Sequence, residues 1–352
     1  MARHRPGYAP VMRTEQLREI IQDRGPFVSV YVDASHDTED AVTQNELRWR
    51  ATETQLAESG ADDATIAAAK RAVLGSPAVG KAGRAVIAAH GDVLCVADLP
   101  VPPANAEARV SPVPYLLPLL ASAEPSVPHV VVLADKTGGR LLAVDADGGA
   151  ASDTVQGSVE DRSEETVRRT AREIAEAATR LVERVDAELL VVAGTISARA
   201  AIQAALPQHV QELVAELDVN AAHTDLDAAE VSTGVRRLLA QRVAEQDEAA
   251  LERFHVASAH GNACEGLSRV TEALRVGAVE TILVTDLSLA DRTVWLGTDP
   301  SQVATGASEL QEAVERRADE AVPAAALATA ANVLVLSGAA TVKDGVAALL
   351  RF

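Results

Sequence analysis

The chain has 352 residues, of which 48% are hydrophobic, and a formal net charge of -19 at pH 7. This length exceeds one ordinary hydrophobic core and predicts roughly two to three domains. A surface this acidic repels the phosphates of nucleic acids, so free diffusion along DNA is excluded and RNA contact requires local basic clusters.

The residue types also restrict which kind of hydrophobic core and which cellular compartment we expect. Three Phe, three Tyr and two Trp are too few to fill the cores, so aliphatic helices packed on Val- and Leu-rich strands are favoured. Apolar runs such as VVVLA fall far short of the ~20 residues that cross a bilayer. Two cysteines far apart in sequence and no secretory signal lead us to expect a reduced, cytoplasmic protein without a membrane segment.

The first region, residues 1–125, is predicted to be an N-terminal α+β domain. Alternation in FVSVYVD indicates a strand, and GRAVIAAHGDVLCVADLP indicates two strands joined by a tight turn at His90-Gly91-Asp92. Helices are expected at TEQLREIIQDRG and from about 45 to 74. The Pro-rich stretch 100–128 predicts the domain boundary near Glu124.

The second region, residues 126–260, begins with the hairpin HVVVLAD and RLLAVDA around the turn 136–139, and a loop follows. A long helix comes next, with Asp161 and Glu164 placed as its cap and apolar residues at helical spacing. Those apolar residues are Val167, Ala171, Ile174, Ala178, Leu181, Val182 and Val185. The strand ELLVVAG, the helix SARAAIQAAL and helical sequence from about 227 to 254 complete the region.

The third region, residues 261–352, reads as a small α/β/α sandwich. We expect strands at ETILVTD, TVWLG and NVLVLSG, a helix at ASELQEAVERRADEAV, and a terminal segment DGVAALLRF.

Three motifs that could carry chemistry favour structural explanations. The sequence from Gly75 to Ala82 lacks the Ser or Thr that follows Lys in a phosphate-binding loop, and it lies between a helix and a strand. Asp33, Ser35 and His36 leave a strand and fit an Asx or Ser turn better than a catalytic triad.

The third motif is a set of potential metal ligands. His255, His260 and Cys264 lack the paired spacing of a zinc site, so no metal or cofactor is expected. Cys95 lies in an apolar strand and is predicted to be a packed thiol.

Local basic clusters are the candidates for RNA contact. Arg48-Trp49-Arg50 combines an aromatic ring with two guanidinium groups, which suits base stacking or phosphate contact. On the long helix, the arginines are interleaved with glutamates, and a solvated face with i,i+4 pairing is the favoured explanation there. The full candidate set is Arg3, Arg5, Arg48, Trp49, Arg50, Lys136, Arg140, Arg168, Arg169 and Arg172.

The order of these segments resembles a known family. HVVVLADKTGGRLLAVDADG, the charged helix, LLVVAG, VETILVTD, DRTVWLG and DGVAALLRF are similar to bacterial relatives of archaeo-eukaryotic peptide chain release factor 1 and Pelota. Among these, the pattern resembles the actinobacterial group that includes relatives of the ribosome hibernation factor Balon. The resemblance covers nearly the whole chain and is clearest over residues 126–352.

The resemblance implies an α/β multidomain protein that enters the ribosomal A site and contacts ribosomal RNA. Its N-terminal domain would face the decoding region. Its middle domain would be RNase H-like and point towards the peptidyl-transferase centre, and its C-terminal domain would be the α/β/α unit. Contact with elongation factor Tu would be allowed by the Balon resemblance, whereas no DNA partner is expected.

Classical release factors carry Gly-Gly-Gln in the loop after the middle-domain hairpin. Here Gly148-Gly149 is followed by Ala150, and the only Gln of the loop, Gln156, precedes Gly157. Acidic flanks, at Asp145, Asp147, Asp153, Glu160 and Asp161, also oppose ribosomal RNA. We therefore expect a non-catalytic ribosome-binding factor of the stress or hibernation kind. Peptidyl-tRNA hydrolysis by a non-standard loop and an acidic protein-binding scaffold remain alternatives.

Overall fold

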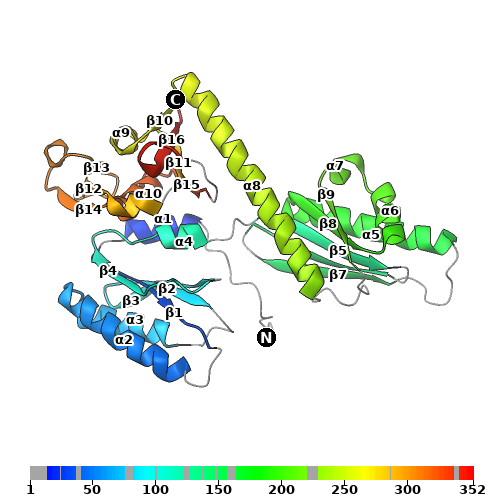
Figure 1. Cartoon of the computed structure of the whole chain (residues 1–352), viewed down its shortest axis with the longest axis horizontal. Helices are drawn as coiled ribbons and strands as arrows, with labels where there is room; N and C mark the ends of the chain where they lie inside the picture. Colours follow the sequence, from blue (N-terminus) through cyan, green and yellow to red (C-terminus); the bar gives the residue numbers. More distant parts are fainter. Residues whose placement is uncertain are drawn as a thin grey trace. The chain divides into compact units, whose positions relative to one another are not determined.

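The computed structural model describes residues 14–23, 25–36, 41–75, 82–99, 101–122, 127–135, 138–146, 149–156, 164–219, 229–285, 287–336 and 341–352. Its contacts divide the chain into two compact units. The first unit combines Met1–Glu124 with Asp247–Phe352, and the second unit is Pro125–Gln246. Figure 1 shows the elements of both. The mixed α/β multidomain class is confirmed, while the division into three domains stays a prediction.

The N-terminal part of the first unit is a four-stranded antiparallel sheet in the order β3-β2-β1-β4. Alternate residues of β1 face opposite sides: Val28, Val30 and Val32 share a core with helices α2 and α3, whereas Phe27 and Tyr31 belong to a different core. Its elements are α1 (Thr14–Gln22), β1 (Phe27–Asp33), α2 (Ala41–Glu58), α3 (Asp63–Val73), β2 (Gly83–Ala89), β3 (Asp92–Leu99), β4 (Glu107–Ser111) and α4 (Leu117–Ser122).

The helical stretch expected from 45 to 74 is two helices. Gly60 adopts a positive φ of 88°, which ends the first helix, and Asp62 caps the second by accepting a hydrogen bond from the backbone N–H of Thr65. The strands on either side of His90-Gly91 are confirmed, and both turn residues have positive φ.

The C-terminal part of the first unit contains two sheets, in the orders β10-β16-β11-β15 and β13-β12-β14. The predicted helix ASELQEAVERRADEAV is wrong up to Arg317. Val314–Arg317 form a strand that pairs with Thr293–Leu296, and the helix begins only at Ala318. Strand pairing with β12 overrode a local helix preference here.

The bounds of these elements are as follows. They are β10 (Ala263–Glu265), α9 (Leu267–Arg275), β11 (Val279–Val284), η1 (Leu287–Asp291), β12 (Thr293–Leu296), β13 (Val303–Ala304), η2 (Ala307–Glu309), β14 (Val314–Arg317), α10 (Ala318–Ala328), β15 (Asn332–Val335), η3 (Lys343–Gly345) and β16 (Val346–Leu350).

The two parts of the first unit share one hydrophobic core. Helix α10 is almost wholly buried, and helix α1 packs against it. The core joins Phe27 and Tyr31 of β1 to Val322 of α10 and Val346 of β16. The side chain of Arg18 donates to the carbonyl oxygen of Ala330 at 3.3 Å. Segments more than 200 residues apart in sequence therefore fold together.

The second unit is a mixed sheet in the order β7-β6-β5-β8-β9 (Figure 1). Helices α5, α6 and α7 pack on one face, and the first part of α8 packs on the other. Its elements are β5 (His129–Asp135), β6 (Gly138–Val144), β7 (Ala150–Gln156), α5 (Glu164–Val185), β8 (Leu189–Gly194), α6 (Ile196–Ala205), α7 (Gln208–Gln211), β9 (Val214–Asp218) and α8 (Ala229–Ala259), whose second half belongs to the first unit.

The predicted hairpin and amphipathic helix are confirmed. Ala171, Ile174, Ala178, Leu181 and Val182 all lie in the buried core under α5. The cap residue Asp161 lies outside the described residues. None of the helices in the described ranges has the length and apolarity to cross a membrane.

Candidate functional site

The turn between β6 and β7 is where a release-factor tip would begin. The backbone N–H of Asp145 donates to the carbonyl oxygen of Gly149 at 3.0 Å, and the Gly149 N–H donates to Asp145 Oδ1 at 2.7 Å. A Cβ on Gly149 would lie 2.6 Å from Asp145 Oδ2, so a larger residue there would displace the Asp145 carboxylate. The chain is thus folded back tightly at Gly149.

Beyond Gly149 the chain is a strand, where the sequence predicted a loop. Residues 150–156 pair with 144–138 along the edge of the sheet, and Gln156 lies opposite Gly138. Seven strand residues span ~20 Å. Gly149 and Gln156 therefore stand at opposite ends of an edge strand, while Gly148 and Gly157 lie outside the described residues.

The exposed side chains of this strand, within its described residues 150–156, are acidic or neutral. Asp153 is exposed and accepts a hydrogen bond from the backbone N–H of Thr154 at 2.8 Å. Asp145 is held by Gly149. Asp147, Glu160 and Asp161 lie outside the described residues. Such a turn does not complement ribosomal RNA.

Two of the candidate residues share a face of the sheet. Arg140 lies opposite Leu133 and Thr154, and Gln156 is two residues along from Thr154. Because Leu133 belongs to the core beneath α8, this is the face opposite α5. Lys136 lies outside the described residues.

Three further arginines lie on the solvent face of α5. Arg168, Arg169 and Arg172 are exposed, among the exposed Glu165 and Glu173. They lie across the sheet from Arg140, so these four candidate arginines do not share one face of the sheet.

In the first unit, helix α2 places Arg48 and Arg50 at the surface but buries Trp49. The Trp49 ring is only 2% exposed, within the core that includes Leu56 and Ile66. The predicted stacking role of Trp49 is wrong for this fold, because the ring packs against the sheet and leaves no face for a base. Arg3 and Arg5 lie outside the described residues.

The two arginines of α2 differ in their surroundings. Arg48 Nη1 lies 3.0 Å from Asp33 Oδ2 and donates to Asn45 Oδ1 at 3.3 Å. The side chain of Arg50 is exposed and has no ion-pair partner among the described residues. Arg50 is therefore the more available cation for a phosphate.

The Asp33-Ser35-His36 motif is a turn, as expected. Asp33 Oδ1 accepts hydrogen bonds from the Ser35 backbone N–H at 2.9 Å and from Ser35 Oγ at 2.5 Å, whereas His36 Nδ1 contacts the Ala34 carbonyl oxygen. Although burial opposes it, the hydrogen bonds from Ser35 and the charge of Arg48 lower the pKa of Asp33. Ser35 Oγ donates to the Asp33 carboxylate, and no imidazole is hydrogen-bonded to it among the described residues.

The remaining motifs bring no reactive groups together among the described residues. Most of the sequence from Gly75 to Ala82 lies outside the described residues, and the order of helix α3 and strand β2 around it is the predicted one. His260 Nδ1 donates to the Val256 carbonyl oxygen at 2.8 Å. Among the residues that the structure describes, no three potential ligands group around a metal position.

Cys95 is confirmed as a packed thiol. Its side chain is buried in the core of the first unit, and that burial raises its pKa to about 12. A thiol of this kind is protonated and inert at neutral pH.

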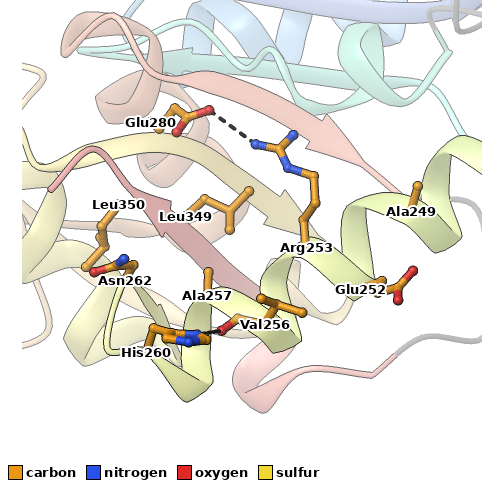
Figure 2. A pocket seen from close by; sticks show the side chains of 10 residues that line it. All are labelled: Ala249, Glu252, Arg253, Val256, Ala257, His260, Asn262, Glu280, Leu349 and Leu350. Atoms are coloured by element: carbon orange, nitrogen blue, oxygen red, sulfur yellow. Dashed lines mark hydrogen bonds and ion pairs between the residues drawn. The ribbon is translucent and has the colours of Figure 1, made fainter.

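A groove of about 540 Å³ lies beside the end of α8 (Figure 2). Val256, Ala257 and Leu349 form its apolar lining, and an ion pair joins Arg253 Nη2 to Glu280 Oε1 at 3.5 Å. The polar side chains of the lining also include Glu252, His260 and Asn262.

Relatives of the chain are similar over almost all of its length. Uncharacterized protein Rv2629 of Mycobacterium tuberculosis (strain ATCC 25618 / H37Rv) is 35% identical and matches 97% of this chain and 97% of that protein. Uncharacterized protein MT2704 of strain CDC 1551 / Oshkosh matches to the same extent.

Among solved structures, Pelota of Archaeoglobus fulgidus is 14% identical, with 96% of this chain and 91% of that chain covered and a TM-score of 0.41. A ribosome-bound archaeal Pelota is 18% identical, with 96% of this chain and 93% of that chain covered and a TM-score of 0.42. Likenesses this distant carry no argument about activity.

The second unit supplies the family assignment. Residues 128–260 match the model of Bacterial archaeo-eukaryotic release factor family 2. This segment contains the sheet β7-β6-β5-β8-β9 with α5 and α8. This match shows that residues 128–260 belong to the bacterial archaeo-eukaryotic release factor family 2, and the chain as a whole is similar to the two mycobacterial proteins.

Proposed function

We propose that this protein is a ribosome-binding translation factor that fills the A site without cleaving the peptidyl-tRNA ester. Its role would be in stress or hibernation, in the manner of Balon. Membership of a release factor family supports ribosome binding. The protein would act by occupying the A site sterically, and elongation factor Tu would be a second partner.

The observation that carries the proposal is the position of Gln156. A release tip needs a Gln beside two glycines, so that backbone and side chain together orient one water. In this chain Gln156 pairs with Gly138 at the far end of β7 from Gly149. Residues 150–156 are hydrogen-bonded to β6 as a strand. The Gln156 side chain therefore cannot approach Gly149 unless this strand unpairs.

Sedimentation of ribosomes tests the binding. Tagged protein in lysates of stationary-phase cells should migrate with intact ribosomes at low salt and leave them as salt rises, because phosphate contacts weaken with ionic strength. Absence from the ribosome peak at low salt contradicts the proposal.

Charge reversal at Arg50 locates an RNA contact. Arg50→Glu should weaken ribosome association, because this exposed guanidinium has no ion-pair partner among the described residues. Arg237→Glu, an exposed site on α8, is the matched control. An acidic scaffold that binds only proteins would keep its ribosome association in both variants.

Peptidyl-tRNA hydrolysis is the second candidate function, and the exposure of Gln156 at the end of β7 favours it. Release of labelled peptide from stalled complexes that is lost in Gln156→Ala would support it. Equal, background release by the wild type and the variant would support occupancy alone.

A further inference from the structure

Helix α10 carries two adjacent carboxyl groups into the interior of the first unit. The side chains of Asp319 and Glu320 are 1% and 5% exposed. They face strand β4 from the N-terminal part, so they lie where the two parts of the unit meet. An ionised carboxylate at such a position is unfavourable unless cations and hydrogen bonds compensate it.

The two carboxyl groups are compensated unequally. Arg317 donates two hydrogen bonds to Asp319, at 3.0 and 2.9 Å, and Arg109 Nη2 lies 3.5 Å from Asp319 Oδ2. Arg109 is itself bonded to Glu107. Glu320 Oε2 is 4.0 Å from Arg109 Nη1, and Glu320 Oε1 has no hydrogen-bond partner among the described residues.

The nearest cations do not pair closely with Glu320. Arg109 and Arg317 are hydrogen-bonded to Glu107 and Asp319, at shorter distances than the 4.0 Å from Arg109 to Glu320. Arg109 also stacks over the ring of Tyr115, at 3.5 Å from its centroid, so its guanidinium is fixed rather than free to approach.

Arg316 on β14 is a further cation near Glu320 and favours its ionised form. Its Nη1 donates to the Glu315 carbonyl oxygen at 2.8 Å rather than to Glu320. The other cations on elements packed against α10 have these partners: Arg18 binds the Ala330 carbonyl oxygen and Asn332, Arg275 pairs with Glu309, and Arg292 pairs with Asp344.

We propose that Glu320 is a proton-operated latch between β4 and α10. The protonated side chain holds the N-terminal and C-terminal parts of the first unit together, and its ionisation loosens their contact. Burial raises the pKa of Glu320, although Ser111, Arg109 and Arg316 oppose that rise. The stabilisation is therefore complete below the ordinary Glu pKa and is lost as pH rises through the raised value. Burial would raise the pKa of Asp319, but Arg317 and Arg109 lower it. The stabilisation from Asp319 therefore has the opposite pH dependence and is lost as pH falls.

Glu320→Gln tests the latch, because Gln keeps the shape of a neutral carboxyl group. The melting temperature of this variant minus that of the wild type should be smallest near about pH 5 and grow by about 2–4 °C towards about pH 8. Amide exchange in 107–111 and 318–328 should slow in the variant at the higher pH, while exchange in β5 and β8 should not change.

Two further variants keep the test decisive. Glu165→Gln, an exposed site in the second unit, removes the same charge and should give no pH-dependent difference. Asp319→Asn should lower the melting temperature at both pH values. A Glu320→Gln variant that is less stable by the same amount at every pH would overturn the proposal, because Glu320 would then act as an ionised partner of Arg109.

Discussion

At the residue scale, Gly194 shows how the sequence constrains the sheet of the second unit. Its φ is +124°, and a Cβ at this position would lie 1.9 Å from the carbonyl oxygen of Ala134 on the neighbouring strand. The carbonyl of Gly194 also accepts a hydrogen bond from buried Arg199 at 2.6 Å. Only glycine fits where β8 turns into α6.

Gly194→Ala should therefore destabilise the protein by at least about 2 kcal/mol, from backbone strain and from the clash with a fixed backbone atom. Gly60→Ala is the matched control, because its φ is also positive but nothing lies within 4 Å of the added Cβ. Its unfolding free energy should fall by about 1 kcal/mol. Urea unfolding of both variants measures the difference. Equal losses would contradict the steric account.

Cys95 gives a second prediction at this scale. With a pKa of about 12 and a buried side chain, the thiol in Cys264→Ser should not react with a thiol reagent at neutral pH until the protein unfolds. Rapid labelling of the folded variant would show that the core opens around β3.

At the element scale, local periodicity predicted α5, the hairpin β5–β6 and strand β8, because each has a continuous apolar face that is buried. It did not predict β7, in which only Ala151 and Val155 are partly covered, nor β14, whose Val314–Arg317 looks helical until it pairs with β12. Strand pairing is a non-local property, and a window of sequence does not contain it.

Helix α2 illustrates the same limit at the candidate site. The Arg-Trp-Arg pattern predicted an exposed ring, but Trp49 anchors α2 to the sheet. Trp49→Ala should cost about 3–5 kcal/mol of unfolding free energy, whereas Arg50→Glu should cost less than about 0.5 kcal/mol. A small loss for Trp49→Ala in chemical denaturation would mean that the ring is not a core residue.

At the scale of the whole molecule, the sequence gives the family pattern but not the assembly of the first unit. Arg109 and Asp319 are far apart in the chain, and only the fold brings them within 3.5 Å. From the family assignment, the tight turn at Gly149 and the edge strand that carries Gln156 away from it, we propose a factor that occupies a ribosomal site rather than one that reacts there.

The most direct test follows a labelled nascent chain and the protein through one sucrose gradient of programmed ribosomes. Occupancy without chemistry predicts that the protein and the label migrate together in the ribosome peak. Label at the top of the gradient, at a level that depends on the protein, or a ribosome peak without the protein, would contradict the account.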